Sequence, residues 1–486
     1  MRNKIILICN VAILSCVIST GCMVGPDYSR PETVIEPTES FIFAGTHDKD
    51  VNDFSAVDKW WESFGDPVTA QLVEEALENN YDLKAAAARV LQAQASLVEA
   101  RGAQLPSVSY SLNRDRSKRS MNLGSAFGGG RFTIMSTTWS QDITVNYLLD
   151  FFGKLKHLEK AAWADLLALQ TNQQALTNSI IASVVSARIN IAITQRRLAL
   201  ARDNIESLER TLEIVERRYE QGLVGPLDIR LARENLASQR AAEPAIELQL
   251  ITARNALDVI LARRPGSSEN LPETLEELPQ FKSIPIGLPA SLLDRRPDVR
   301  AAEFSLIAAN ERVGVTIAQL YPDLTLSGTF GYSGDTMEEI FQYDYTEMYA
   351  AMMALAQPIF NGGQLRAQID AAKARYEELA ANYAGTVLNA IREVEDALIT
   401  EQMLRTQLEQ AEIRLTEARA AEDLSRQRYQ SGVEGILSVL ESERRSRMSE
   451  EELIALKGQI WSSRVNLYLA LGGDWNNQQK NYAVDK

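Results

Sequence analysis

Residues 154–221 read KLKHLEKAAWADLLALQTNQQALTNSIIASVVSARINIAITQRRLALARDNIESLERTLEIVERRYEQ and contain neither proline nor glycine. The equally long stretch 364–431 has no proline and one glycine, Gly385. As continuous helices, these stretches would each extend roughly 100 Å at about 1.5 Å per residue. The mean globular helix has about 11–12 residues, so helices of this length cannot be buried in one ordinary domain. They must span a gap or line a tube.

The first long stretch carries a narrow apolar stripe. Its apolar residues recur at steps of three, four and seven, as in Leu198, Ile205, Leu208, Leu212 and Val215. This spacing is typical of a coiled-coil-like seam. The pattern predicts long helices that pack against neighbouring helices and leave much of their surface in water.

Residues 1–21 read as a secretory signal peptide. Arg2 and Lys4 form a short basic start, and residues 5–18 form an apolar core too short to cross a bilayer. No run of about 20 apolar residues follows, so no transmembrane helix is expected. If the chain crosses a membrane, it must therefore do so as a β-barrel.

The end of the signal, residues 19–21 followed by Cys22, resembles the lipobox of bacterial lipoproteins. We therefore predict lipidation of Cys22, with an N-palmitoyl and an S-diacylglycerol group. Ser19 stands where an aliphatic residue is usual, so an ordinary secretory signal with an incidental cysteine is the alternative. Met23, in the place of an aspartate, favours the outer membrane by resemblance to sorting rules in enteric bacteria. The other two cysteines lie in the signal, so no internal disulfide is expected.

The chain is an internal duplication. At a separation of 210 positions, the matching residues are Arg218 and Arg428, Tyr219 and Tyr429, Gly222 and Gly432, Gly225 and Gly435, and Leu227 and Leu437. Each half is predicted to contain a helix, two extended segments joined by a loop, a long helix, a turn and a further helix.

This duplication sets the predicted domain boundaries. A lipid-anchored tether covers residues 22–60, the first repeat 61–263, the second repeat 298–473, and a C-terminal tail 474–486. The repeats are joined by a connector, residues 264–297, whose six prolines exclude a continuous helix.

Several short segments alternate apolar with small or polar residues, which is the period of a two-faced strand. The predicted strands are 107–113, 143–149, 324–332 and 348–356, and the predicted polar connections are 114–138 and 333–346. Four strands of about ten residues suit a tilted membrane crossing. Four strands cannot close a barrel, because about eight is the smallest number, and lipid does not tolerate open sheet edges. A membrane location therefore requires an oligomer in which each subunit contributes one section of a shared wall.

Three motifs resemble those of the TolC-like outer-membrane factors, in their lipoprotein branch, and they run in family order over almost the whole mature chain. The first motif comprises Trp60-Trp61, Phe64-Gly65-Asp66-Pro67, Leu77, Asn80, Asp82-Leu83 and Ala88-Arg89-Val90. The second is GLPASLLDRRPDV at 287–299, and the third is QPIFNGG at 357–363.

The resemblance implies an α+β membrane protein that forms a trimer. Its twelve-stranded β-barrel, with four strands per subunit, would lie in the outer membrane and continue into a long periplasmic α-helical barrel. An equatorial layer containing the connector would ring the helices. The implied function is the exit duct of a tripartite efflux system, passing small toxic compounds such as drugs to the exterior. The implied partners are a periplasmic adaptor (a membrane fusion protein), an inner-membrane pump of the resistance-nodulation-division class, and outer-membrane lipid, with no cofactor.

A passive duct needs a closed end, and the natural place is the periplasmic tip, where the long helices turn back. Gly222 with Gly225, and Gly432 with Gly435, predict two helical hairpin turns. By resemblance, these hairpins, together with Arg218 and Tyr219 at the end of the first long helix, also contact the adaptor.

By resemblance, Arg428, Tyr429 and Glu441 match positions of the family's gate network. We hypothesise that Arg428 and Tyr429 bind acidic partners such as Asp228 or Glu441 and hold the inner helix pair closed. Asp228 is inferred from its place one turn inside the hairpin. For each residue, a solvated surface charge without a gating role is the alternative.

Other function classes fit the sequence less well. The two histidines, His47 and His157, have no metal-ligand spacing to any partner, and no G-x-S-x-G, P-loop or dinucleotide motif indicates an enzyme. The net charge of −15 disfavours nucleic acid as a partner. A lipid-anchored periplasmic coiled-coil scaffold without channel activity would explain the long helices and Cys22, but not the paired alternating segments.

Overall fold

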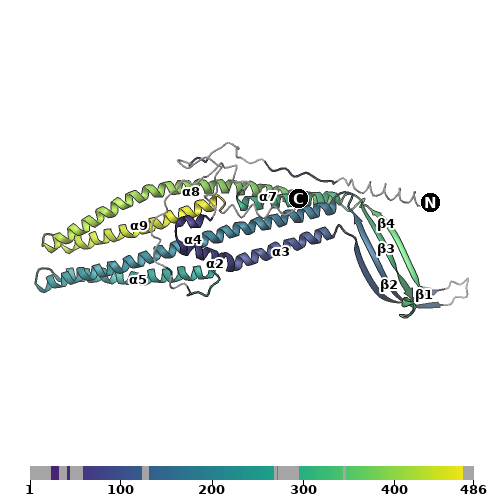
Figure 1. The fold of residues 1–486 in the computed structure, drawn as a ribbon, viewed down its shortest axis with the longest axis horizontal. Helices are drawn as coiled ribbons and strands as arrows, with labels where there is room; N and C mark the ends of the chain where they lie inside the picture. Colours follow the sequence, from purple (N-terminus) through teal and green to yellow (C-terminus); the bar gives the residue numbers. More distant parts are fainter. Residues whose placement is uncertain are drawn as a thin grey trace. The chain divides into compact units, whose positions relative to one another are not determined.

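The computed structural model describes residues 23–31, 41–43, 59–122, 131–267, 271, 295–342 and 346–473 (Figure 1). The predicted signal peptide, Cys22 and the predicted tail lie outside the described residues, as do most of the tether and the connector. The chain packs into two compact units. The first contains described residues within 1–31, 90–169 and 302–383, and the second those within 32–89, 170–301 and 384–486.

The predicted duplication is confirmed by the order of the elements. The first repeat contains α3 (Tyr81–Gly102), β1 (Ser107–Asn122), β2 (Arg131–Leu149), α4 (Lys154–Glu220) and α5 (Pro226–Ile260). The second contains α7 (Pro297–Ala318), β3 (Asp323–Gly334), β4 (Glu347–Ala356), α8 (Gln364–Gln430) and α9 (Ile436–Ala470). Equivalent helices have equal lengths, with 22 residues in α3 and α7, 67 in α4 and α8, and 35 in α5 and α9. The shorter elements are η2 (Trp60–Phe64), α2 (Pro67–Asn79) and η5 (Glu339–Phe341).

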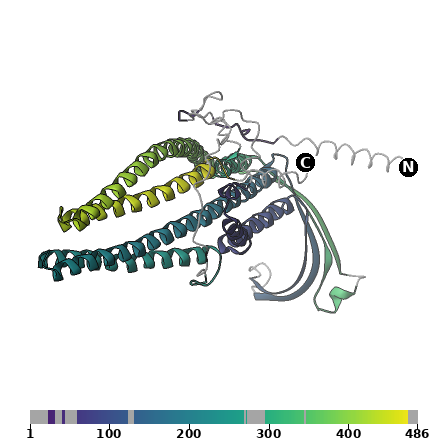
Figure 2. The same ribbon diagram turned by 60° about the vertical axis from the view of Figure 1, so that its left-hand side comes forward.

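The first unit contains one antiparallel sheet of four strands in the order β1-β2-β3-β4. Figure 2 shows that this sheet is strongly curved. Each strand pairs with its neighbour in sequence, β1 with β2, β2 with β3, and β3 with β4. Within the described residues, the outer strands β1 and β4 therefore each have one edge without a strand beside it.

The predicted connection at 114–138 is wrong, because most of it is strand. β1 continues to Asn122 and β2 begins at Arg131, and the two strands pair along this whole extension. Backbone hydrogen bonds hold the ladder, so polar side chains such as Arg114 do not end it. The guanidinium of Arg114 lies 5.3 Å from the ring centre of Trp139 on the facing strand. The connection at 333–346 is also shorter than predicted, since β3 extends to Gly334 and η5 follows.

The two faces of the sheet carry different side chains. The cross-strand register aligns one apolar row, which contains Tyr110, Ile143, Phe330 and Tyr349. Their exposed fractions are 62, 48, 46 and 82% respectively. The adjacent row consists of Ser109, Thr144, Thr329 and Ala350. Because successive residues of a strand point to opposite faces, the middle of the sheet has an exposed apolar row on one face and a row of small and polar residues on the other.

The second unit contains two helical hairpins, α4 with α5 and α8 with α9, whose helices lie side by side in both views (Figures 1 and 2). At both turns a glycine has positive φ, 75° at Gly222 and 76° at Gly432, which other residues adopt only at a cost. The amide of Gly222 donates to the carbonyl of Tyr219, and that of Gly432 to the carbonyl of Tyr429. The two predicted hairpin turns are therefore confirmed.

The first motif of the sequence packs the core of the second unit. Trp60 stacks on Tyr468 with ring centres 5.2 Å apart. The carboxylate of Asp66 caps α2 and lies 3.1 Å from Nε of Arg188, which is fully buried. Burying a charge is costly unless it is paired, so Asp66 stabilises the buried Arg188 and this motif serves packing.

Arg296 of the second motif connects three helices of the same unit. Its guanidinium donates to Asp298 of α7 at 2.8 Å, to Glu393 of α8 at 2.7 Å, and to the carbonyl of Ala470 in α9 at 2.9 Å. This motif is therefore also structural.

Candidate functional site

The residues predicted to form the gate lie at the two hairpin turns. Arg428 and Tyr429 lie in the last turn of α8, Asp228 in the first turn of α5, and Glu441 in the second turn of α9. Tyr429 is buried, whereas Tyr219, its counterpart in the first repeat, is 43% exposed. The two repeats therefore use the same residue differently.

Arg218, at the end of α4, joins the two hairpins. Its guanidinium carbon lies 4.6 Å from the ring centre of Tyr429. Its Nη1 donates to the backbone carbonyls of Tyr429 and Gln430, the second at 3.4 Å. The last carbonyls of a helix have no helical partner and carry the negative end of the helix dipole. A cation from one hairpin thus caps the long helix of the other.

Tyr429 is held in a neutral state at this contact. Burial raises the pKa of its phenol above the ordinary 10.0, Arg218 acts in the opposite direction, and Asp228 raises the pKa further. Asp228 therefore lies close enough to influence Tyr429. The hydroxyl of Tyr429 is buried and has no hydrogen-bond partner among the described residues.

The predicted pairing of Arg428 with Asp228 or Glu441 is not what the single chain contains. Arg428 donates to Glu434, within its own turn, at 3.0 Å. Glu441 accepts from Arg444 and Arg445 on its own helix, each at 2.8 Å. These arginines hold the pKa of Glu441 down at about 2. In the single chain, Arg428 and Glu441 therefore pair with residues close to them in the sequence of the same hairpin.

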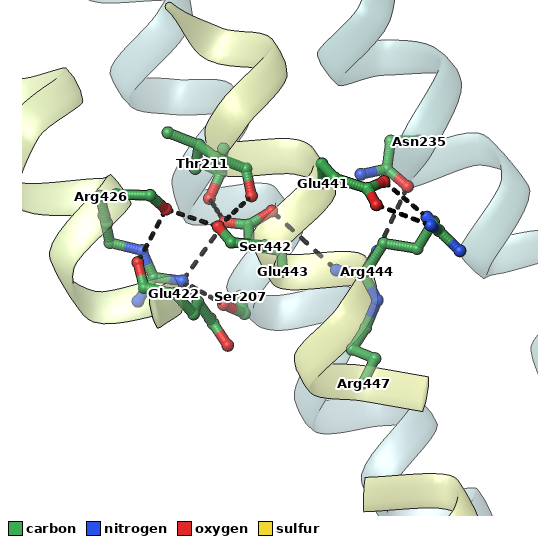
Figure 3. A network of polar contacts seen from close by, with 12 residues as sticks. Ser207, Thr211, Asn235, Glu422, Arg426, Glu441, Ser442, Glu443, Arg444 and Arg447 are labelled. Carbon is green, nitrogen blue, oxygen red and sulfur yellow. Dashed lines mark hydrogen bonds and ion pairs between the residues drawn. The ribbon is translucent and has the colours of Figure 1, made fainter. Parts of the chain in front are cut away.

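A buried polar cluster that sequence reasoning missed connects all four helices of the hairpins (Figure 3). The Glu443 cluster consists of Glu443 and Arg447 of α9, Arg426 of α8 and Thr211 of α4. The Thr211 hydroxyl donates to Oε1 of Glu443 at 2.8 Å, and Arg426 donates to the same oxygen at 3.3 Å. Arg447 lies 3.9 Å from Oε2 of Glu443 and donates to Asn235 of α5 at 3.5 Å.

The charges of the Glu443 cluster are strongly desolvated. Glu443 is 2% exposed, and burial raises the pKa of its carboxyl above 4.5, although Thr211, Arg426 and Arg447 act in the opposite direction. Burial likewise lowers the pKa of Arg447. Breaking a buried ion pair by removing one partner typically costs about 3–5 kcal/mol. Loss of one member of this cluster is therefore expected to weaken the connection between the hairpins near their turns.

One signal in the sequence marks this cluster. The buried residues of α9 include Ile436, Val439, Glu443 and Ser446, at steps of three and four. This is the spacing of a helix seam, and Glu443 occupies a seam position that would ordinarily hold an apolar residue.

The described residues contain no group of three or more His, Cys, Asp or Glu side chains placed to hold a metal ion. One of their helices, α4, has an 18-residue window apolar enough to cross a membrane, which the sequence analysis did not expect. Because 56% of that window is buried, and core helices pass the same test, this is weak support for a membrane span.

The curved sheet and the long hairpins define the class of protein. An exposed apolar face suits lipid, an opposite polar face suits a water-filled lumen, and outer strands in lipid must be paired by further strands. These features are those of a subunit of a membrane channel. A scaffold without channel activity does not account for the exposed apolar row.

The model of the outer membrane efflux protein family matches residues 72–263 and 288–473. The chain therefore belongs to this family. It is 30% identical over 464 residues to the toluene efflux pump outer membrane protein TtgF of Pseudomonas putida, covering 94% of this chain and 95% of the relative. It is 32% identical over 444 residues to the pyoverdine export outer membrane protein OpmQ of Pseudomonas aeruginosa, covering 89 and 90%.

Solved structures agree with this assignment. The outer-membrane channel OprN has a TM-score of 0.83 and 28% identity, covering 93% of this chain and 100% of that one. The open state of the MtrE channel of Neisseria gonorrhoeae has a TM-score of 0.77 and 26% identity, covering 93 and 99%. The predicted fold class, a trimeric β-barrel continuous with a helical barrel, is the fold class of these channels. The chain is thus an outer-membrane channel of an efflux system, in a family of channel proteins.

Proposed function

We propose that this channel is the exit duct of a tripartite machine, docked to a periplasmic adaptor and to an inner-membrane pump of the resistance-nodulation-division class. Its relatives are named for toluene, for pyoverdine and for cations. Cargoes this different suggest that such ducts contact cargo loosely and that the pump selects it. We therefore propose small toxic compounds, including drugs, as cargo, and lipidation of Cys22 as an additional anchor in the outer membrane.

The observation that carries the docking proposal is the apolar surface of the hairpin turns. Leu223 and Leu227 of the first hairpin, and Val433 and Leu437 of the second, are all strongly exposed. Exposed apolar groups that recur at equivalent places indicate an interaction surface. These turns are shaped by the proposed adaptor-contact residues, which are Arg218, Tyr219, Gly222, Gly225, Gly432 and Gly435. The exposed leucine and valine side chains would insert into an apolar surface of the adaptor.

Adaptor copurification tests this surface. Leu223→Asp combined with Val433→Asp places a charge in the proposed contact, and we expect recovery of the adaptor from detergent extracts to fall by about tenfold or more, since every 1.4 kcal/mol is tenfold. Gln221→Glu with Gln430→Glu adds the same charge and keeps the apolar side chains, so it should retain the adaptor. Full recovery with the first pair, or equal loss with both, would refute the docking surface.

We further propose that the duct is closed at this end. The Arg218–Tyr429 contact and the Glu443 cluster would hold the hairpins of one subunit together. Arg428, Glu441 and Asp228, which lie within two helical turns of the hairpin turns, would bind across subunits in the closed state. Exposed pairs are worth only about 0–1 kcal/mol each, but three symmetric copies acting together could hold a two-state closure.

Single-channel recording tests the exposed gate residues. Arg428→Ala combined with Glu441→Ala should raise the conductance of the purified channel in a planar bilayer, because pairs across subunits would be lost. Arg375→Ala, which removes an exposed pair with Glu378 early in α8, serves as the control and should leave conductance unchanged. A conductance equal to wild type in the double variant would remove Arg428 and Glu441 from the gate.

A further inference from the structure

The hairpin of β1 and β2 extends beyond the rest of the described sheet. β3 pairs with β2 only as far as Gly334, which lies opposite Trp139. Beyond that level, residues 115–122 of β1 pair with residues 131–138 of β2, and no other described strand joins them. This extension lies at the end of the strands away from α3 and α4. Because the helices of this family are periplasmic, the extension faces the exterior.

One face of β1 changes from apolar to basic along the strand. Alternate residues share a face, and those on the face of the exposed apolar row are, in order, Val108, Tyr110, Leu112, Arg114, Arg116 and Lys118. All of them are exposed. Arg131, opposite Asn122, adds a further basic residue to this face. The face that suits lipid therefore continues into a cationic surface.

The change occurs at the level expected for the membrane boundary. Arg114 lies opposite Trp139, and its guanidinium carbon is 5.3 Å from the centre of the indole ring. Tryptophan is enriched where a membrane meets water. On the same face, the row from Leu149 to Trp139 spans roughly 25 Å across the membrane, at about 3.3 Å per residue and a tilt of about 40°. This equals the apolar band of outer-membrane barrels, about 25 Å, so Arg114 lies at the outer edge of the hydrocarbon.

The basic row is taller than the headgroup layer of an ordinary phospholipid. With the same rise and tilt, Arg116 lies about 5 Å and Lys118 about 10 Å beyond Arg114. A phospholipid headgroup layer adds only about 5–8 Å to each side of the hydrocarbon. The height of the row therefore indicates a thicker headgroup that carries negative charge.

The described residues do not neutralise this row. Arg116 and Lys118 form no ion pair with another described residue, and Asp115 points to the opposite face of β1. By contrast, exposed arginines of the helices pair with a carboxylate, as Arg210 does with Glu206. The row is cationic although the whole chain has a net charge of −15. Neighbouring like charges repel, so an anion from outside would stabilise the row.

We propose that Arg114, Arg116 and Lys118 form a binding site for the phosphate groups of an anionic glycolipid in the outer leaflet of the outer membrane. Guanidinium groups bind phosphate through two parallel hydrogen bonds. The Trp139 ring holds the guanidinium of Arg114 at the edge of the hydrocarbon, and the apolar residues below it contact the acyl chains. The site depends on the location of the channel in the outer membrane and not on the proposed adaptor or pump.

Native mass spectrometry of the full-length channel in detergent, titrated with diphosphorylated lipid A, tests this site. Arg116→Gln should weaken binding by about fivefold, and Arg116→Gln combined with Lys118→Gln by roughly thirtyfold, because each basic side chain near an anionic lipid surface contributes about fivefold. Arg119→Gln is the matched control, since it removes the same charge from the opposite face of β1, and it should bind as the wild type does. Equal loss in Arg116→Gln and Arg119→Gln would refute a site on the outward face.

Two further lipids test the chemistry on the wild-type channel, without any substitution. Lipid A from which both phosphates have been removed should bind at least thirtyfold more weakly than the diphosphorylated form. Phosphatidylglycerol, an ordinary anionic phospholipid, should also bind more weakly, by about tenfold, because its phosphate does not reach Lys118. Equal affinity for the two forms of lipid A, or equal affinity for lipid A and phosphatidylglycerol, would overturn the glycolipid site.

Discussion

Phe330→Arg is expected to prevent assembly of the channel in the outer membrane. Phe330 lies in the middle of β3 and belongs to the exposed apolar row of the sheet. An arginine on the lipid face of a barrel costs about 2–4 kcal/mol near the bilayer midplane, and symmetry places one in every subunit. The heat-modifiable oligomer band in outer-membrane fractions should fall by about tenfold or more.

Thr329→Arg is the matched control, because it places the same side chain one residue earlier and on the opposite face. The hydroxyl of Thr329 lies 3.1 Å from that of Thr144 in the polar row. Substitutions that face the lumen alter selectivity more than assembly, so this variant should assemble normally and shift ion selectivity toward anions. Equal assembly of both variants, or failure of Thr329→Arg alone, would show that the lipid and lumen faces are assigned wrongly.

Glu443→Ala is expected to loosen the two hairpins from each other. Removal of the Glu443 carboxylate leaves Arg426 and Arg447 without the charge that they share, and it leaves the Thr211 hydroxyl without its acceptor. A loss of about 3 kcal/mol, at the lower end for broken buried ion pairs, would shift an equilibrium between joined and separated hairpins by roughly a hundredfold. Planar-bilayer recordings should show much longer open times than for the wild type.

Glu443→Gln keeps the shape of the side chain and removes its charge, so the pH dependence of thermal stability becomes a second test of the cluster. Because burial raises the pKa of Glu443 above 4.5, its protonation favours the folded state, and this contribution is complete below about pH 4.5 and lost as the pH rises through the folded-state value. The glutamine variant is neutral throughout, so its thermal stability should depend less on pH between 4.5 and 7. Identical pH profiles, or wild-type open times in Glu443→Ala, would contradict the role of the cluster.

The long helices were predictable because their composition excludes alternatives. The predicted stretches 154–221 and 364–431 exceed α4 and α8 by one residue each. The absence of proline from both stretches, with Gly385 as their one glycine, leaves the helix as the natural conformation, and glycines with positive φ mark where each helix stops. The predicted strands 324–332 and 348–356 also begin and end within two residues of β3 and β4. These two segments are short, and their apolar residues recur at the spacing of a strand.

Other features depend on tertiary context. The extension of β1 was missed because residues 114–120, which include Arg116 and Lys118, are all polar. Only their pairing with β2 identifies them as strand. The burial of Tyr429 and the exposure of Tyr219 follow from packing, since both repeats carry the same residue there. Glu441 was predicted from its resemblance to the family's gate positions, and that resemblance does not point to the buried Glu443, which only its place in the α9 seam marks.

The most direct test of a shared barrel is the oligomeric state of the full-length channel, measured by native mass spectrometry together with planar-bilayer conductance. In the described residues the outer strands β1 and β4 each have one edge without a partner strand, and in lipid these edges must be paired by strands of further subunits. We expect three chains per particle, a dependence on detergent or lipid, and stable ion conductance. A monodisperse single chain that stays in aqueous solution without surfactant and conducts no ions would contradict the account.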